Sequence, residues 1–121
     1  PILVAWKETP EAARAVAAAM PFIEAAARVV VLSVSEDAAA QQAGSERMRK
    51  SLHRRNPATE LRQLTRDGQP PVELLLAEAA DLDASMLVMG GYSHSRLRQA
   101  VFGGFTRRVL SGADLAVLMA H

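Results

Sequence analysis

The chain has 121 residues and a formal net charge of +1. That length suits one compact domain with a buried core, so we expect residues 1–121 to form a single domain. The absence of cysteine excludes disulfides, thiolate metal sites and thiol nucleophiles. The longest apolar stretches fall well short of the ~20 residues that span a bilayer. No secretion signal opens the sequence, and we expect a cytoplasmic protein with no membrane partner.

The first half of the chain alternates apolar runs with helical patterns. Residues 2–6 (ILVAW) and 29–34 (VVVLSV) are short and continuously apolar, which is typical of strands buried on both faces. Between them, Thr9 offers an N-cap oxygen ahead of a proline, which predicts a helix from about Pro10 to Ala26. A second helix with an arginine-rich outer face is predicted from Gln41 to Arg55.

The second half repeats this alternation. Residues 59–65 (TELRQLT) alternate between polar and apolar side chains, as expected of a strand exposed on one face and close to a sheet edge. Glycine and proline signals then separate four further predicted elements. These are a helix over Val72–Ala80, a buried strand over Met86–Met89, a helix over Thr106–Ser111 and a last strand over Leu115–Met119.

The predicted order of strands and helices defines the fold class. Strands that alternate with helices, and that are rich in valine and leucine, indicate an open parallel sheet with helices on both faces. We therefore predict an α/β fold with five parallel strands and helices on both faces. Ligands of such sheets bind beyond the carboxyl ends of the strands, where the strand order reverses.

A glycine-rich segment begins at the carboxyl end of the fourth predicted strand. It reads MGGYSHSRLRQAVFGGFT over residues 89–106 and holds four of the seven glycines of the chain. Two familiar phosphate loops are excluded, because no glycine follows the first strand and no GxxxxGK[ST] motif is present. Gly103 and Gly104, directly before a predicted helix, would instead offer backbone N–H groups to an anion.

This segment resembles the nucleotide-binding loop of the universal stress protein family. The family pattern is Gly, two residues, Gly, nine residues, and Gly followed by Ser or Thr; here these positions hold Gly90, Ser93, Gly103 and Gly104. The flanking residues SHSRLR and GGFT resemble family members closely. The resemblance extends over essentially the whole chain, from the opening ILVAW strand to the LVMG strand. It implies a fold of the flavodoxin or Rossmann type, with the five strands in the order 3-2-1-4-5.

The resemblance implies a stress-response module that binds ATP or a related adenine nucleotide, with Mg²⁺ entering only together with the nucleotide. It implies that the phosphates lie against the glycine-rich loop and the adenine near the ends of the first two strands. The implied binding residues are Trp6, Lys7, Val34, Gly90, Ser93, Gly103, Gly104, Phe105 and Thr106.

Three positions depart from the family pattern and keep a second hypothesis open. Lys7 stands where nucleotide binders of the family usually carry an acidic residue, and lysine cannot accept a hydrogen bond. Ser93 replaces a glycine, and Gly104 replaces a hydroxyl donor. The alternative is therefore a structural or interaction domain of the same fold that binds no nucleotide. We expect no enzyme in either case, because His94 has no acid or hydroxyl partner at a recognisable spacing.

Two charged groups are interpreted as structural. Five cations gather on the second predicted helix, but no aromatic residues lie among them to stack on bases, so we expect a solvated helix face and no nucleic-acid partner. They are Arg47, Arg49, Lys50, Arg54 and Arg55. Asp81 and Asp83 are expected in a turn before the fourth strand, at the end of that strand opposite to the site.

The last predicted strand suggests an assembly. Leu115–Met119 is apolar and lacks the charges and prolines that protect a sheet edge. We expect a homodimer through this strand, or a pseudo-dimer if the chain is half of a tandem protein, with Val117 and Met119 near the two-fold axis. Pro1 is compatible with either origin.

Overall fold

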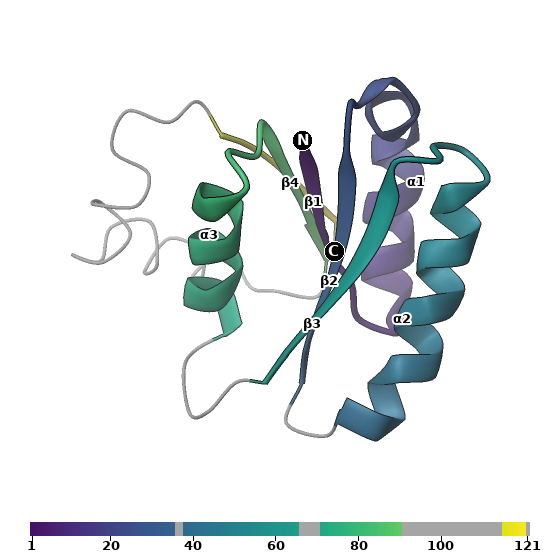
Figure 1. The fold of residues 1–121 in the computed structure, drawn as a ribbon, viewed down its shortest axis with the longest axis vertical. Coiled ribbons are helices and arrows are strands. Elements are labelled where there is room, and N and C mark those ends of the chain that lie inside the picture. Colours follow the sequence, from purple (N-terminus) through teal and green to yellow (C-terminus); the bar gives the residue numbers. More distant parts are fainter. Residues whose placement is uncertain (36–37, 66–70, 91–114, 121) are drawn as a thin grey trace.

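The computed structural model describes residues 1–35, 38–65, 71–90 and 115–120. In these residues a single sheet of five parallel strands has the order β3-β2-β1-β4-β5. Helices flank it on both faces (Figure 1). The elements are β1 Ile2–Ala5, α1 Pro10–Ala25, β2 Val29–Ser35, α2 Ala38–His53, β3 Thr59–Thr65, α3 Pro71–Asp81, β4 Met86–Gly90 and β5 Ala116–Ala120.

The predicted fold class is confirmed, and the element bounds differ only locally. The helix predicted from Gln41 begins three residues earlier, at Ala38, where a run of alanines has high helix propensity. The first strand ends at Ala5 and the last runs to Ala120. The helix predicted over Thr106–Ser111 lies outside the described residues.

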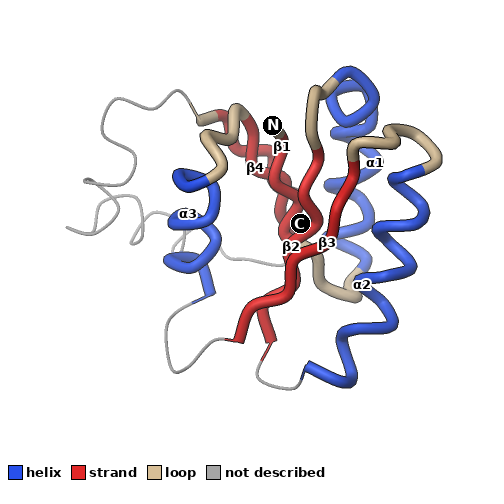
Figure 2. The backbone as a smooth tube through the Cα atoms, viewed as in Figure 1, coloured by secondary structure: helices blue, strands red, loops and turns tan. Residues whose placement is uncertain are grey.

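The core consists of two layers, one on each face of the sheet. Side chains alternate along β1, so Val4 faces α1 and α2 while Leu3 faces α3. In β2 and β4 the alternation repeats, with Val31 and Val88 on the first face and Leu32 and Met89 on the second. The tube in Figure 2 shows the same arrangement, with α1 and α2 together on one side of the strands and α3 on the other.

This arrangement creates the reversal point of the sheet. From β1 the chain moves outward through α1, β2, α2 and β3, with both helices on one face. It then returns through α3 on the opposite face to β4, which pairs with the other edge of β1. The connections that leave β1 and enter β4 therefore lie on opposite faces, which is the topology that places a ligand at the carboxyl ends of these two strands.

Helix α1 begins as the sequence predicts. Thr9 adopts an extended conformation and its hydroxyl oxygen accepts a hydrogen bond from the Ala12 backbone N–H at 3.2 Å. Pro10 occupies the start of the helix, and Glu11 adds a negative charge to the first turn. This cap satisfies one of the N–H groups that have no partner within the helix.

The carboxyl end of α1 is closed by a residue from a distant loop. The Asn56 amide nitrogen donates to the carbonyl oxygens of Ile23 and Ala26, both at 2.8 Å. Its amide oxygen accepts from the Ala58 N–H at 2.9 Å, and the residue is only 6% exposed. Asn56 thus replaces the glycine that commonly ends a helix, and it joins α1 to the start of β3.

Helix α3 ends in a Schellman motif. Asp83 has a positive φ of 52°, the Asp83 N–H donates to Ala80 O, and the Ala84 N–H donates to Ala79 O. Asp81 is the last residue of α3, and both carboxylates precede β4. As predicted, Asp81 and Asp83 lie at the helix-to-strand connection before β4, at the amino end of that strand.

Gly90, the last residue of β4, lies directly against the first turn of α1. A Cβ atom at Gly90 would come within 2.4 Å of the Glu11 backbone carbon and oxygen and 2.5 Å of the Ala12 nitrogen. Backbone atoms cannot move away as a flexible side chain can. Gly90 is therefore required for the packing of α1 on β4, whatever the glycine-rich segment binds.

We predict that Asn56→Ala destabilises the fold by about 1–3 kcal/mol. It removes the amide donor from the Ala26 and Ile23 carbonyls, and Ile23 O then keeps the 3.3 Å bond from the Ala26 N–H. Urea unfolding at equilibrium measures this. Asn56→Asp, which keeps an acceptor for Ala58 but has no donor, should be destabilised as well. A loss of less than ~0.5 kcal/mol in both variants, as for an ordinary surface substitution, would contradict the assigned role.

We predict that Gly90→Ala destabilises the fold by about 1–3 kcal/mol through overpacking against α1. The sign of the stability change distinguishes a crowded position from an open one. At an open, unstrained position Gly→Ala stabilises a protein by roughly 0.4–1 kcal/mol, because it restricts the unfolded chain. Thermal and urea unfolding of the ligand-free protein measure it. A more stable variant would show that β4 and α1 are further apart than described.

Candidate functional site

The site suggested by the sheet topology lies at the carboxyl edge of β1, β2 and β4. β1 stops first: Ala5 pairs with Leu32, whereas β2 and β3 continue through Ser35 and Thr65. The Trp6 backbone N–H still donates to Leu32 O at 2.9 Å, and the chain then turns into α1. The short central strand therefore leaves its loop, residues 6–9, beside the longer β2.

Four of the predicted binding residues come together at this edge. Trp6 and Lys7 follow β1, Val34 lies near the end of β2, and Gly90 ends β4. The other five, Ser93, Gly103, Gly104, Phe105 and Thr106, lie outside the described residues. The described part of the predicted site is therefore assembled by β1, β2 and β4, whose carboxyl ends share one edge.

The side chains of these residues do not face the same way. Trp6 packs into the core layer beneath α1 and α2 and is 8% exposed. Val34 packs on the opposite face, against the layer beneath α3. Lys7 directly follows Trp6 in the chain and is half-buried. A ligand of this edge would meet the end of the sheet itself and only the rim of the Trp6 indole.

Sequence reasoning missed Glu8. Its carboxylate accepts a hydrogen bond from Trp6 Nε1 at 3.2 Å, and its second oxygen lies 3.5 Å from Arg47 Nη2 on α2. Gly44 of α2 gives the carboxylate room, since a Cβ there would lie 2.4 Å from Glu8 Oε1. The available signal was Gly44 itself, because a glycine inside a helix often marks a close approach.

Three arginines of α2 and of the turn that follows it form ion pairs. Arg47 pairs with Glu8, Arg55 with Glu24 at 3.5 Å, and Arg49 with Glu46 at 2.6 Å. The hydrogen bond from Arg49 holds the pKa of the Glu46 carboxyl below its ordinary value, and the same bond raises the pKa of Arg49. These pairings favour the interpretation of this face as a solvated helix surface.

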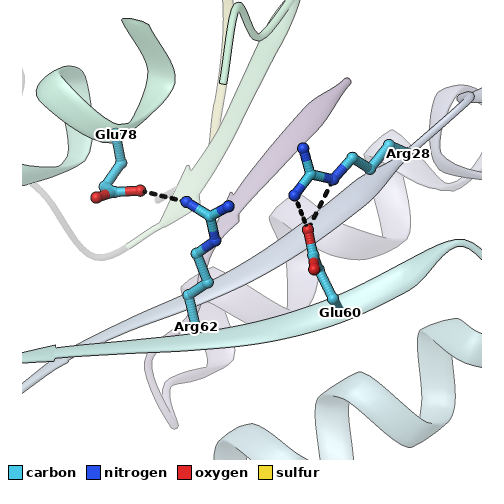
Figure 3. A network of polar contacts seen from close by, with 4 residues as sticks. All are labelled: Arg28, Glu60, Arg62 and Glu78. Carbon is cyan, nitrogen blue, oxygen red and sulfur yellow. Dashed lines mark hydrogen bonds and ion pairs between the residues drawn. The ribbon is translucent and has the colours of Figure 1, made fainter. Parts of the chain in front are cut away.

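The edge strand β3 carries paired charges on the α3 side. Arg28 donates to Glu60, and Arg62 donates to Glu78 of α3 at 3.1 Å (Figure 3). Charged residues on an edge strand discourage pairing with another chain.

The described residues contain neither a membrane-crossing helix nor a cluster of metal ligands. No helix among them is long and apolar enough to cross a membrane. Within the same ranges, no three His, Cys, Asp or Glu side chains are close enough together to hold a metal ion.

The fold is shared with solved universal stress proteins. The Lactobacillus plantarum protein UspA superposes with a TM-score of 0.68 at 15% identity, over 99% of this chain and 96% of that one. A universal stress protein in complex with cAMP gives 0.63 at 21% identity, over 99% and 94%. An Archaeoglobus fulgidus universal stress protein gives 0.66 at 18% identity, over 98% of this chain and 43% of that longer one.

The comparison of sequences leads to the same family. No match is found among curated proteins. The model of the universal stress protein family, however, matches residues 1–121, the full length of the sequence. With the five-stranded parallel sheet in the order 3-2-1-4-5, this match establishes that the chain belongs to the universal stress protein family.

Proposed function

We propose that this chain is a stress-response module that binds ATP or another adenine nucleotide at the carboxyl edge of β1, β2 and β4. The observation that carries the proposal is the convergence of Trp6, Lys7, Val34 and Gly90 at the reversal point of the sheet. The complex of a related fold with cAMP, an adenine nucleotide, supports it.

In this proposal the protein acts by binding and not by catalysis. The phosphates would contact the loop residues Ser93 and Gly103–Thr106, whose N–H groups and positions are those that the family resemblance implies, and Mg²⁺ would arrive with them. The nucleotide-bound state would then be read by a partner in the cytoplasm.

A second candidate is an interaction domain that binds no nucleotide. Two observations favour it: the Trp6 indole is buried and bonded to Glu8, and Lys7 supplies only donors beside it. The chain also corresponds to 43% of the longer Archaeoglobus fulgidus protein. A domain that supports the nucleotide-binding half of a tandem protein would fit these observations.

The nucleotide proposal predicts that the purified protein releases an adenine nucleotide when it is denatured, or binds ATP in titration calorimetry. Gly103→Val should abolish binding, because a branched side chain blocks the approach of phosphate to the backbone. Circular dichroism and the melting temperature check that the variant is folded. Affinity should also fall with added salt. A folded Gly103→Val with unchanged affinity would exclude this loop as the phosphate site.

We further propose that two domains pair through β5. Its sequence AVLMA has no charge or proline, and Val117 is 38% exposed. The other edge, β3, carries Glu60, Arg62 and Gln63 instead. Since an unprotected edge offers unpaired backbone groups, antiparallel pairing of two β5 strands about a two-fold axis would satisfy both copies.

This predicts a dimer at micromolar concentration that Val117→Lys dissociates, because two lysines near the axis would repel each other. Gln63→Lys places the same charge on the β3 edge and should remain dimeric. Analytical ultracentrifugation measures both. A wild-type protein that sediments as a one-domain monomer would end the proposal.

A further inference from the structure

The β1–α1 loop is joined to α2 through one carboxylate. Glu8 Oε1 accepts from the Trp6 indole N–H at 3.2 Å, and Glu8 Oε2 lies 3.5 Å from Arg47 Nη2. These contacts connect the end of β1 with the middle of a helix some 39 positions further along the chain. The loop that holds Lys7 is therefore fixed from outside as well as by its own backbone.

Backbone contacts hold the rest of this loop. The Trp6 N–H donates to Leu32 O at 2.9 Å, the Thr9 N–H donates to Lys7 O at 2.8 Å, and the Thr9 hydroxyl caps α1. The Lys7–Glu8 segment lies between these anchors. The Glu8 side chain supplies a contact that ties this segment to α2.

Gly44 makes that contact possible. It is buried in the interior of α2, where glycine is unfavourable relative to alanine. A Cβ at this position would lie 2.4 Å from Glu8 Oε1, 2.6 Å from its carboxyl carbon and 2.7 Å from Cγ. Any larger residue would displace the Glu8 carboxylate from Trp6.

The two contacts of the Glu8 carboxylate differ in strength. The pair with Arg47 is exposed, at 53% for Glu8 and 70% for Arg47, so solvent screens it and it contributes little. The bond from the indole is part-buried, comes from a residue that is 8% exposed and has a carboxylate acceptor, which makes a hydrogen bond stronger. The Trp6–Glu8 bond therefore dominates.

We propose that Glu8 is a positioning residue: through Trp6 and the space left by Gly44 it fixes the β1–α1 loop against α2 and so sets where Lys7 stands at the carboxyl edge. The proposal deepens the nucleotide site and rests on that proposed function for its effect on binding. Its structural part stands without ligand. Glu8 acts through the position of the loop, so its loss should alter both the environment of Trp6 and the affinity of the site.

The first experiment uses Trp6, the one tryptophan of the chain, as a reporter. Acrylamide quenching of its fluorescence is measured in the ligand-free protein. Glu8→Ala should raise the quenching constant about two-fold as the indole loses its partner and turns toward water, whereas Glu8→Gln, whose amide oxygen can accept, should stay close to wild type. Glu24→Ala is the matched control, because Glu24 also makes a 3.5 Å ion pair with an arginine, Arg55 in the turn after α2.

Equal quenching in Glu8→Ala and Glu24→Ala would overturn the proposal. Gly44→Ala provides an independent test. Helix propensity alone predicts a higher melting temperature, while displacement of Glu8 predicts a lower one together with increased quenching. A Gly44→Ala variant with a higher melting temperature and the wild-type quenching constant of Trp6 would also overturn the proposal.

The last measurement is ATP titration of the same variants. Glu8→Ala should weaken binding roughly three- to ten-fold, the equivalent of one lost hydrogen bond, with Glu8→Gln and Glu24→Ala unchanged. If the wild type takes up no ATP, the nucleotide proposal fails, and quenching and melting still decide whether Glu8 fixes the loop. If ATP binds and Glu8→Ala retains full affinity with an exposed Trp6, the positioning role is wrong.

Discussion

The structure depends on the burial of β1, a strand of four residues that is covered on both faces and paired along both edges. Apolar side chains that point both ways require a helical layer on each face of the sheet. Two layers in turn require crossovers that leave β1 on one face and enter β4 from the other. The reversal point, and with it the candidate site, follows from the burial of this one strand.

Contacts between distant segments then fix the ends of the elements around β1. Asn56, which precedes β3, donates hydrogen bonds to carbonyl groups at the carboxyl end of α1. Gly90 allows the amino end of α1 to pack against the end of β4. Glu8 joins the loop after β1 to α2. Asn56 thus gives hydrogen-bond donors to carbonyl groups at a helix end, which have no partner within the helix. Gly90 leaves the space for two backbone segments to pack closely, and Glu8 accepts a hydrogen bond from a side chain.

The two edges of the sheet differ in chemistry. β3 carries charged side chains that are paired with Arg28 and with Glu78 of α3, while β5 is apolar along its length. In the assembly proposal, a neighbour would add at the β5 edge only, which would limit growth to a closed pair. The assembly proposal and the nucleotide proposal therefore concern different parts of the molecule: the first uses the outer edge of β5 and the second the carboxyl ends of β1, β2 and β4.

The sequence by itself determined the elements, their order and the fold class, because apolar runs such as VVVLSV and the Thr9-Pro10 cap are local signals. It also located Lys7, Val34 and Gly90 at one edge, since parallel strands share their carboxyl ends. Only the tertiary structure decided that Trp6 and Val34 face opposite sides, that Gly90 serves the packing of α1, and that Glu8 meets Gly44 and Arg47. These facts depend on contacts between residues far apart in the chain, which periodicity and spacing do not record.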